Sequence, residues 1–169
     1  MTRPAPPADF YRPNEYSAND SVGYLLRRLI HTIRAEIDLR LEPHDLTHAQ
    51  WEPLYKLKKC QAGTVAELAR ELQTDPGATT RLLDRLEAKG LCKRVRSTED
   101  RRVVNLELTP EGEASAEHIP QALADVMNAH LAGFSKTEWQ ALLGYLRRML
   151  ANADVLREAR EMPEQKLSK

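Results

Sequence analysis

The most constraining feature of this sequence is the stretch 64–109, in which helix signals give way to the alternation typical of strands. Thr64 and Glu67 have the spacing of a capping box, in which two side chains bond the backbone at the start of a helix. Asp75 followed by Pro76 marks a second start, because Asp caps helices and proline loses no hydrogen bond at the first helical position. Two short helices separated by a three-residue turn predict a helix-turn-helix.

The second of these helices is the one predicted to enter a major groove of DNA. Its leucines fall on one side, and Gly90 is predicted to end it. Small and polar residues occupy the other side and the N-terminal end, where they suit contacts with base edges and phosphates. The candidate DNA-binding residues of this helix are Pro76, Gly77, Ala78, Thr79, Thr80, Arg81, Asp84 and Arg85.

Alternation with period two runs through 91–96 and returns through 104–109, on either side of a polar, arginine-rich loop. This pattern predicts a β-hairpin, the wing, whose tip projects into solvent. Arginine at such a tip suits the narrow, electronegative minor groove, and Arg101 is the strongest single candidate. Arg96 and Arg102 are as well placed to brace Asp100 as to touch phosphate. The candidate wing residues are Arg96, Ser97, Thr98, Asp100, Arg101 and Arg102.

The stretch 68–112 resembles the winged helix-turn-helix core of the multiple-antibiotic-resistance regulator (MarR) family. The most specific part is Asp100-Arg101-Arg102, which is followed by Leu106, Leu108, Thr109 and Gly112. The similarity extends outward to 46–51 and covers roughly residues 22–150. The chain departs from the family's pattern in a long proline-rich N-terminal extension, in Cys92, where an aliphatic residue is usual, and in the polar stretch 58–61.

Helical periodicity flanks this core on both sides. Apolar residues recur at intervals of three and four over 22–41, and capping pairs open further helices at 47–60 and from 135 onward. A long helix over 109–133 contains Pro120, where we predict a kink. The predicted division is an irregular arm (1–20), dimerisation helices (21–46 and 109–157), a winged helix-turn-helix lobe (47–108) and a polar tail (158–169).

The predicted fold class is mainly α (α+β), with the long N- and C-terminal helices forming a dimerisation base. These helices carry more apolar surface than one small domain can cover, so we predict a twofold homodimer. Its two recognition helices would then lie about one DNA turn apart on a palindromic site. The family resemblance implies the same triangular dimer.

Composition limits the possible partners. The formal net charge of the 169 residues is zero, but the segment 76–102 carries eight basic and four acidic residues, which favours a local basic patch. Two cysteines are too few for a disulfide framework, and no apolar run has the length of a membrane span. We therefore expect a cytoplasmic, bacterial protein with no membrane partner. No nucleophile–base pair, phosphate loop or carboxylate pair predicts an enzyme or a cofactor.

The resemblance implies a site for aromatic carboxylates between the dimer base and the DNA-binding lobe. Cations and rings of the first two helices suit such a ligand, although the aromatic residues are equally suited to the core and the cations to the surface. The candidate ligand-binding residues are His31, Arg34, His48, Trp51 and Tyr55.

Two further kinds of site were weighed. His44 and His48 have a zinc-ligand spacing, but Thr47 as a helix cap leaves His44 outside the helix, so we expect no metal. Cys60 and Cys92 lie beside basic residues, which suits either a redox-sensing thiol or a small space-filling side chain.

Together these features predict a sequence-specific DNA-binding transcriptional regulator. The expected activity is repression of nearby genes, with release from a palindromic operator when a small phenolic or aromatic acid binds. Two alternatives remain: a thiol-redox-sensing repressor of the same fold, and a winged-helix module that binds a protein and no DNA.

Overall fold

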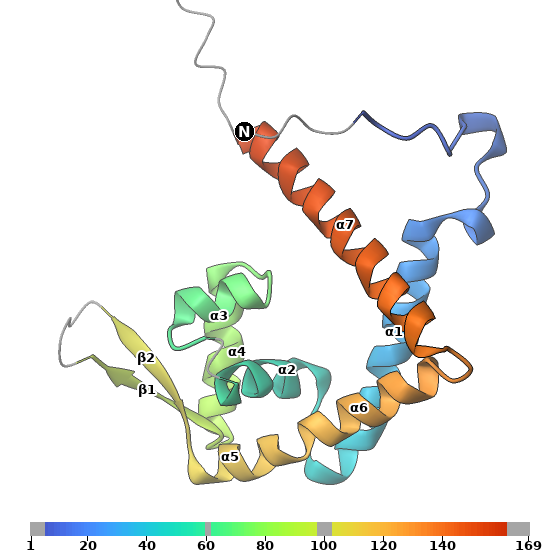
Figure 1. Ribbon diagram of the computed structural model, residues 1–169. Helices are drawn as coiled ribbons and strands as arrows, with labels where there is room; N and C mark the ends of the chain where they lie inside the picture. The colour runs from blue at the N-terminus through green and yellow to red at the C-terminus, as the bar shows by residue number, and fades with distance from the viewer. Residues whose placement is uncertain (1–5, 60–61, 98–102, 162–169) are drawn as a thin grey trace, which may run out of the picture. The chain divides into compact units, whose positions relative to one another are not determined.

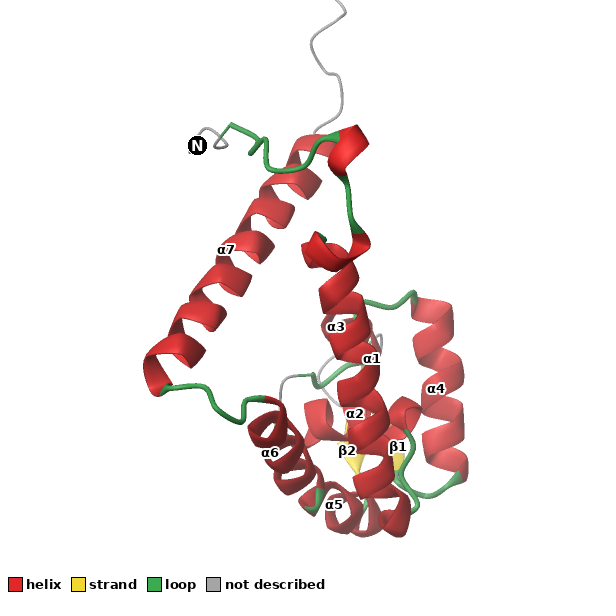
Figure 2. Cartoon of the chain, turned by 90° about the vertical axis from the view of Figure 1, so that its right-hand side faces the viewer, coloured by secondary structure: helices red, strands yellow, loops and turns green. Residues whose placement is uncertain are grey.

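The computed structural model describes residues 6–59, 62–97 and 103–161. Helices dominate these residues, and the β structure is one two-stranded antiparallel sheet (Figure 2). The main elements are α1 (Val22–Leu41), α2 (His48–Lys58), α3 (Val65–Glu71), α4 (Pro76–Ala88), β1 (Cys92–Arg96), β2 (Val104–Leu108), α5 (Pro110–Glu117), α6 (Ile119–His130) and α7 (Lys136–Glu161). Short 3₁₀ turns lie at η1 (Pro13–Glu15), η2 (Ala18–Asp20) and η3 (Glu42–His44). This composition confirms the predicted mainly α fold with a small antiparallel sheet.

The chain forms two compact units, residues 22–130 and residues 1–21 with 131–169. The first unit holds α1 to α6 and the hairpin, which projects beyond the helices (Figure 1). One hydrophobic core joins these elements, because each helix and both strands place apolar side chains in it. Its fully buried members include Leu41, Leu54, Leu68, Leu83, Leu86, Ile119 and Val126.

The sheet has the register expected of a hairpin, with Cys92 opposite Leu108 and Arg96 opposite Val104. The segment before α3 extends this sheet on the β2 side. There the N–H of Leu106 donates to the carbonyl of Gly63 at 2.8 Å, and an isolated bridge joins Thr64 and Asn105. The hairpin is therefore attached to the helical lobe at its base.

The predicted helix starts are confirmed. The hydroxyl of Thr64 accepts the N–H of Glu67 at 3.2 Å, and Asp75 accepts the N–H of Ala78 at 2.9 Å, with Pro76 at the first helical position. Both halves of the capping box at Thr47 are present at the start of α2. The carboxylate of Glu67 accepts the N–H of Gly63 at 2.8 Å, and this bond lowers its pKa.

Two expectations for the later helices were wrong. The predicted kinked helix over 109–133 is two helices, α5 and α6, with His118 between them. Pro120 lies in the first turn of α6, where its missing N–H needs no partner. Helix α7 continues to Glu161 instead of ending near 157, because its last turns consist largely of good helix formers with an Arg157–Asp154 pair at 2.9 Å.

Large apolar side chains are exposed on α1 and, in the other unit, on α7. On α1 they are Val22, Leu25, Leu26, Leu29, Ile30 and Leu39, and on α7 they include Trp139, Tyr145, Met149, Leu150 and Leu156. The aromatic residues Phe10, Tyr11 and Tyr16 of the N-terminal segment are exposed as well. Across the described part of the chain, no helix combines the length and apolar character needed to cross a membrane.

Candidate nucleic-acid interface

Helix α4 presents one exposed strip beside the hairpin. Leu83 and Leu86 anchor its opposite side in the core with no exposed surface. Six of the eight predicted DNA-binding residues of this helix are exposed, namely Pro76, Gly77, Thr80, Arg81, Asp84 and Arg85, whereas Ala78 is half-buried. A helix with a buried leucine side and a small, polar outer side has the shape and chemistry required to lie in a major groove.

Thr79 was wrongly assigned to that outer strip. It is fully buried, and its hydroxyl bonds the hydroxyl of Thr74 at 2.8 Å and the carbonyl of Asp75 at 3.1 Å. These bonds hold the turn between α3 and α4. The signal was present in the sequence, because Thr79 shares the 79, 83, 86 spacing of a helix face with Leu83 and Leu86.

Arg94 of β1 is a functional candidate that the sequence analysis missed. Its guanidinium contacts Asp84 at 2.8 Å, the carboxylate of Glu87, and the carbonyl of Thr80 at 3.2 Å. Its backbone N–H also donates to Glu87 at 2.8 Å. Asp84, predicted to face DNA, is therefore already paired. The spacing of 80, 84 and 87 marks one side of a helix, but only tertiary packing brings it against β1.

Lys89 ties the C-terminal end of α4 to the turn before α2. Its ammonium donates to the carboxylate of Asp45 at 2.9 Å and to the carbonyl of the same residue at 3.1 Å. Asp45 itself has a φ of 54°, in the left-handed region. Gly90, with a φ of 70°, ends α4 as predicted. Helix α4 is thus fixed at both of its ends.

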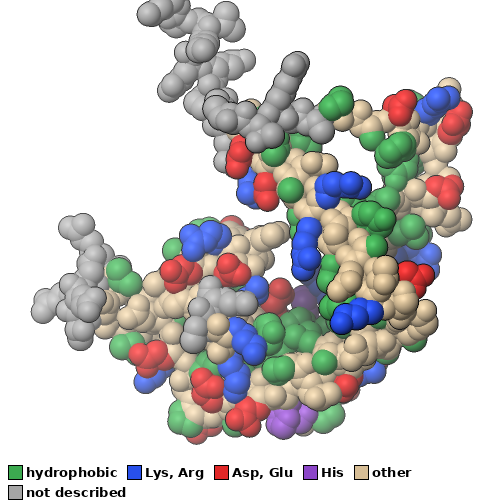
Figure 3. Space-filling view, viewed as in Figure 1, with side chains coloured by type: hydrophobic (Ala, Val, Ile, Leu, Met, Phe, Trp, Pro, Cys, Tyr) green, Lys and Arg blue, Asp and Glu red, His purple; other side chains and the backbone are tan. Residues whose placement is uncertain are grey.

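The wing is described up to its tip. Arg96 is exposed at the end of β1, and the N–H of Ser97 donates to the carbonyl of Val103 at 3.0 Å. The predicted wing residues Thr98, Asp100, Arg101 and Arg102 lie outside the described residues. Basic and acidic side chains are interspersed over the lobe that carries the hairpin (Figure 3). On the face that Figure 3 shows, the described residues of this lobe therefore present mixed charges.

The five predicted ligand-binding residues do not gather in one cavity. His31 and Arg34 are exposed on α1. Trp51 is a core residue, and its indole N–H donates to Asp38 at 3.3 Å. Tyr55 packs against the core and lies under the Lys59 ammonium, which is 5.9 Å from the ring centroid. Of the five, His48 lines a groove between α2 and α4, and none of the other four belongs to that groove.

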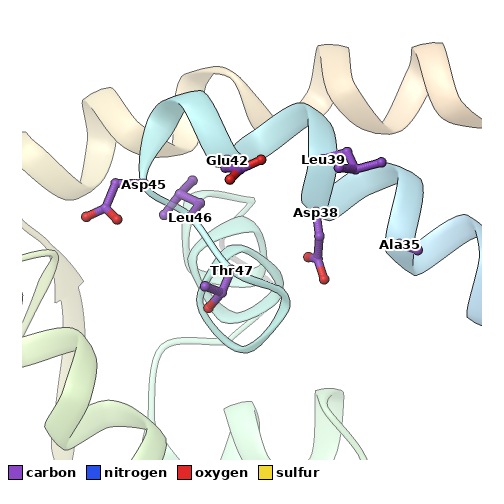
Figure 4. A pocket seen from close by; sticks show the side chains of 7 residues that line it. All are labelled: Ala35, Asp38, Leu39, Glu42, Asp45, Leu46 and Thr47. Carbon is purple, nitrogen blue, oxygen red and sulfur yellow. The ribbon is translucent and has the colours of Figure 1, made fainter.

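A groove of about 560 Å³ lies where α1, η3 and α2 meet (Figure 4). Leu39, Leu46 and Ala35 give it an apolar surface. Three carboxylates, of Asp38, Glu42 and Asp45, complete the lining together with Thr47, and no cationic side chain belongs to it. This chemistry does not match the predicted aromatic carboxylate, because like charges repel.

A second groove of about 350 Å³ lies between α2 and α4. His48, Arg81 and Arg85 supply its nitrogen donors, and Glu52 is its one carboxylate. The Nδ1 atom of His48 is buried without a hydrogen-bond partner, while Nε2 lies 3.8 Å from Glu52. The apolar lining residues are Ala49, Pro53, Leu72, Ala78 and Leu82. The groove therefore joins cationic and apolar surface beside α4.

The two chemical alternatives have little support among the described residues. Cys92 is buried, and burial raises the pKa of its thiol to about 11, with the nearby Glu87 adding to the shift. Cys60 lies outside the described residues. His44 stacks on His118 with ring centroids 3.7 Å apart instead of joining His48. No group of three or more potential metal ligands occurs in the part of the chain that the structure describes.

Comparisons with known proteins agree with this geometry. The model of the MarR family matches residues 46–104. The HTH-type transcriptional repressor MdtR of Bacillus subtilis is 34% identical over 113 residues, which cover 67% of this chain and 73% of that protein. A mutant of MarR from E. coli, solved with operator DNA, is 30% identical over 76% of this chain and 93% of its own, with a TM-score of 0.70. The MepR–DNA complex of S. aureus is 27% identical over 81% of this chain and 99% of its own, with a TM-score of 0.72.

Proposed function

Because the chain belongs to the MarR family of transcriptional regulators, we propose that it represses nearby genes by binding a palindromic operator as a homodimer. A small phenolic or aromatic acid then releases it from that operator. The protein acts in the bacterial cytoplasm, where its DNA lies, and it is not an enzyme.

One observation carries this proposal: the exposed strip of α4 lies beside a hairpin that projects from the same lobe (Figure 1). A helix in the major groove and a wing over the adjacent minor groove need this arrangement. Relatives with the same fold have been solved on operator DNA and on duplex DNA.

The exposed apolar side chains of α1 and α7 support the homodimer. Leu25, Leu26, Leu29 and Ile30 alone make a continuous apolar face on the first half of α1, with exposures of 37% to 48%. Apolar patches of this kind on a water-exposed helix mark a protein interface. A twofold axis then sets the two recognition helices one DNA turn apart, and this spacing requires a palindrome.

The groove between α2 and α4 supports the acidic effector. A carboxylate there meets Arg81 and Arg85, and an aromatic ring meets Leu72 and Leu82. Both arginines also lie on the outer side of α4, so a bound acid competes with DNA for them. The effector thus favours the free protein, which is the differential affinity that release requires.

Binding of the purified protein to the DNA just upstream of its own gene tests the proposal. We expect affinity for that duplex to exceed affinity for a scrambled duplex of the same length by at least 10³-fold. Equal affinity for the two would overturn the specific-regulator assignment. Capture of a stable protein partner by a chain that binds no duplex would favour the interaction module instead.

Salicylate and benzyl alcohol test the effector, since they share a ring but differ in charge. Salicylate is expected to release the operator and benzyl alcohol is not. Arg85→Ala is expected to weaken the response to salicylate, whereas Arg70→Ala, an exposed arginine of α3 outside the groove, leaves it unchanged. Release by both compounds, or by neither, would contradict the acidic effector.

A further inference from the structure

We propose that Arg94 is a positioning residue for DNA binding: it locks β1 onto α4 and neutralises Asp84, and it makes no phosphate contact itself. This inference rests on the proposed function, because it concerns how the recognition helix and the wing are held for one duplex. It assigns Arg94 an internal role that differs from a direct contact with DNA.

In the lock, the single side chain of Arg94 contacts α4 from Thr80 to Glu87. The guanidinium of Arg94 reaches the carbonyl of Thr80 at 3.2 Å, Asp84 at 2.8 Å and the carboxylate of Glu87. Those three residues lie on one side of α4 at intervals of four and three, so the side chain lies along the helix. Glu87 also accepts the backbone N–H of Arg94 at 2.8 Å, which fixes the strand as well as the side chain.

This connection matters because a two-stranded sheet has little stability of its own. The Lys93–Glu107 pair at 3.0 Å joins the two strands to each other but does not reach α4. Arg94 therefore couples the direction of the hairpin to that of the recognition helix. A wing that turned freely would lose the preorganised spacing on which simultaneous contact with two grooves depends.

The charges around Arg94 also support a positioning role. Arg94 faces two carboxylates and is about one quarter exposed, so releasing it toward a phosphate would leave Asp84 and Glu87 without their cation. Asp84 stands on the exposed strip of α4, where its negative charge would repel the DNA backbone. Pairing with Arg94 cancels that charge, which makes Asp84 a partner of the lock and not a reader of bases.

Substitution of Glu87 distinguishes a positioning role of Arg94 from a direct contact of Arg94 with phosphate. Glu87→Ala removes both contacts that Glu87 makes in the lock, to the guanidinium and to the backbone N–H of Arg94, and leaves the guanidinium with Asp84 and Thr80. Glu87→Gln removes the charge alone. If Arg94 contacts phosphate, freeing it leaves operator affinity unchanged or higher. We expect the opposite: at least a tenfold loss for Glu87→Ala, a smaller loss for Glu87→Gln, and an unchanged salt dependence, since no phosphate contact is lost.

Glu107→Ala is the matched control, because it removes an equal charge whose partner, Lys93, is also on β1, without touching α4. Its operator affinity is expected to stay within twofold of the wild-type value. Operator affinity equal to or above wild type in both Glu87 variants would overturn the proposal. So would a change of sequence preference in Asp84→Asn, because that change would make Asp84 a base reader.

Hydrogen exchange without DNA gives a second readout that does not depend on the proposed function. Amide protons of 92–96 are expected to exchange faster in Glu87→Ala than in the wild type and in Glu107→Ala, at similar global stability. Unchanged exchange rates of these amide protons in Glu87→Ala would contradict the proposed lock. If the wild type bound no operator but the amide protons of 92–96 still exchanged faster in Glu87→Ala, the result would contradict the proposed function and support the lock.

Discussion

Gly112 and Leu91 approach so closely that a Cβ atom on Gly112 would lie 1.8 Å from the carbonyl oxygen of Leu91. Leu91 is the residue between Gly90 and β1, and Gly112 lies in the first turn of α5. The carbonyl of Leu91 also accepts the N–H of Thr109 at 3.2 Å. This contact seats α5 against the start of the hairpin, so position 112 has no room for a side chain.

Gly112→Ala should therefore destabilise the protein by about 1–3 kcal/mol, the usual cost of overpacking a well-packed site. The comparison is Gly144→Ala in α7, where a Cβ atom meets nothing within 4 Å. That change should stabilise the chain by about 0.5–1 kcal/mol, since alanine is the better helix former. Urea unfolding measures both, and equal midpoints for the two variants would contradict the packing argument.

Cys92 should behave as an inert thiol at neutral pH. Burial raises its pKa from 9.0 to about 11, so the native state holds the thiol proton more tightly than the unfolded chain does. Its contribution to stability is complete below pH 9 and is lost as the pH rises through about 11. Cys92→Ala should flatten the stability profile over that range. Rapid labelling of native Cys92 by a thiol reagent at pH 7, or loss of operator binding when peroxide oxidises that residue, would revive the redox alternative.

Thr79→Val tests the assignment of Thr79 to the interior. The substitution keeps the shape of the side chain but removes its bonds to Thr74 and Asp75, so stability should fall by about 1–2 kcal/mol. Operator affinity of the folded variant should equal that of the wild type, because the side chain is fully buried. A changed base preference in a variant as stable as the wild type would indicate that Thr79 contacts DNA from the outer strip of α4.

Glu138 should make the start of α7 sensitive to acid. Hydrogen bonds from the hydroxyl and the backbone N–H of Ser135 lower the pKa of this carboxylate below 4.5. Its stabilisation is therefore present above pH 4.5 and is lost as the pH falls through the lowered value. Glu138→Gln should show less destabilisation by acid than the wild type, measured as thermal midpoints at pH 6 and pH 3. Glu158→Gln is the control, and an equal response in both variants would contradict this origin.

The helix starts were predictable because each is encoded by residues within four positions of one another. Thr64 with Glu67 and Asp75 with Ala78 needed no knowledge of distant parts of the chain. Pro120 shows the limit of such local reasoning. A proline signals an interruption, but whether it kinks one helix or starts another depends on whether the chain before it is already helical.

The site was less predictable because it depends on contacts between elements. Arg94 on β1 contacts Asp84 on α4, which precedes it by ten residues in the sequence. The alternation that predicts the strand gives no information about this contact. The sequence left open whether Trp51 binds a ligand or packs in the core. In the structure it is a core residue whose indole N–H donates a hydrogen bond to Asp38. The acidic lining of the α1–α2 groove likewise depends on the η3 turn, which the sequence analysis did not anticipate and which brings Glu42 and Asp45 to the same groove as Asp38 of α1.

The two outward N–H groups at the middle of the hairpin are both occupied. That of Arg94 is taken by Glu87, and that of Leu106, directly opposite, is taken by the carbonyl of Gly63. A foreign strand that approached either side would find no free donor there on which to start a ladder. The exposed edges of a projecting hairpin can pair with strands of other molecules and so cause aggregation. Here the bonds to Glu87 and Gly63 hold the hairpin in place and also occupy the edge N–H groups that such pairing would use.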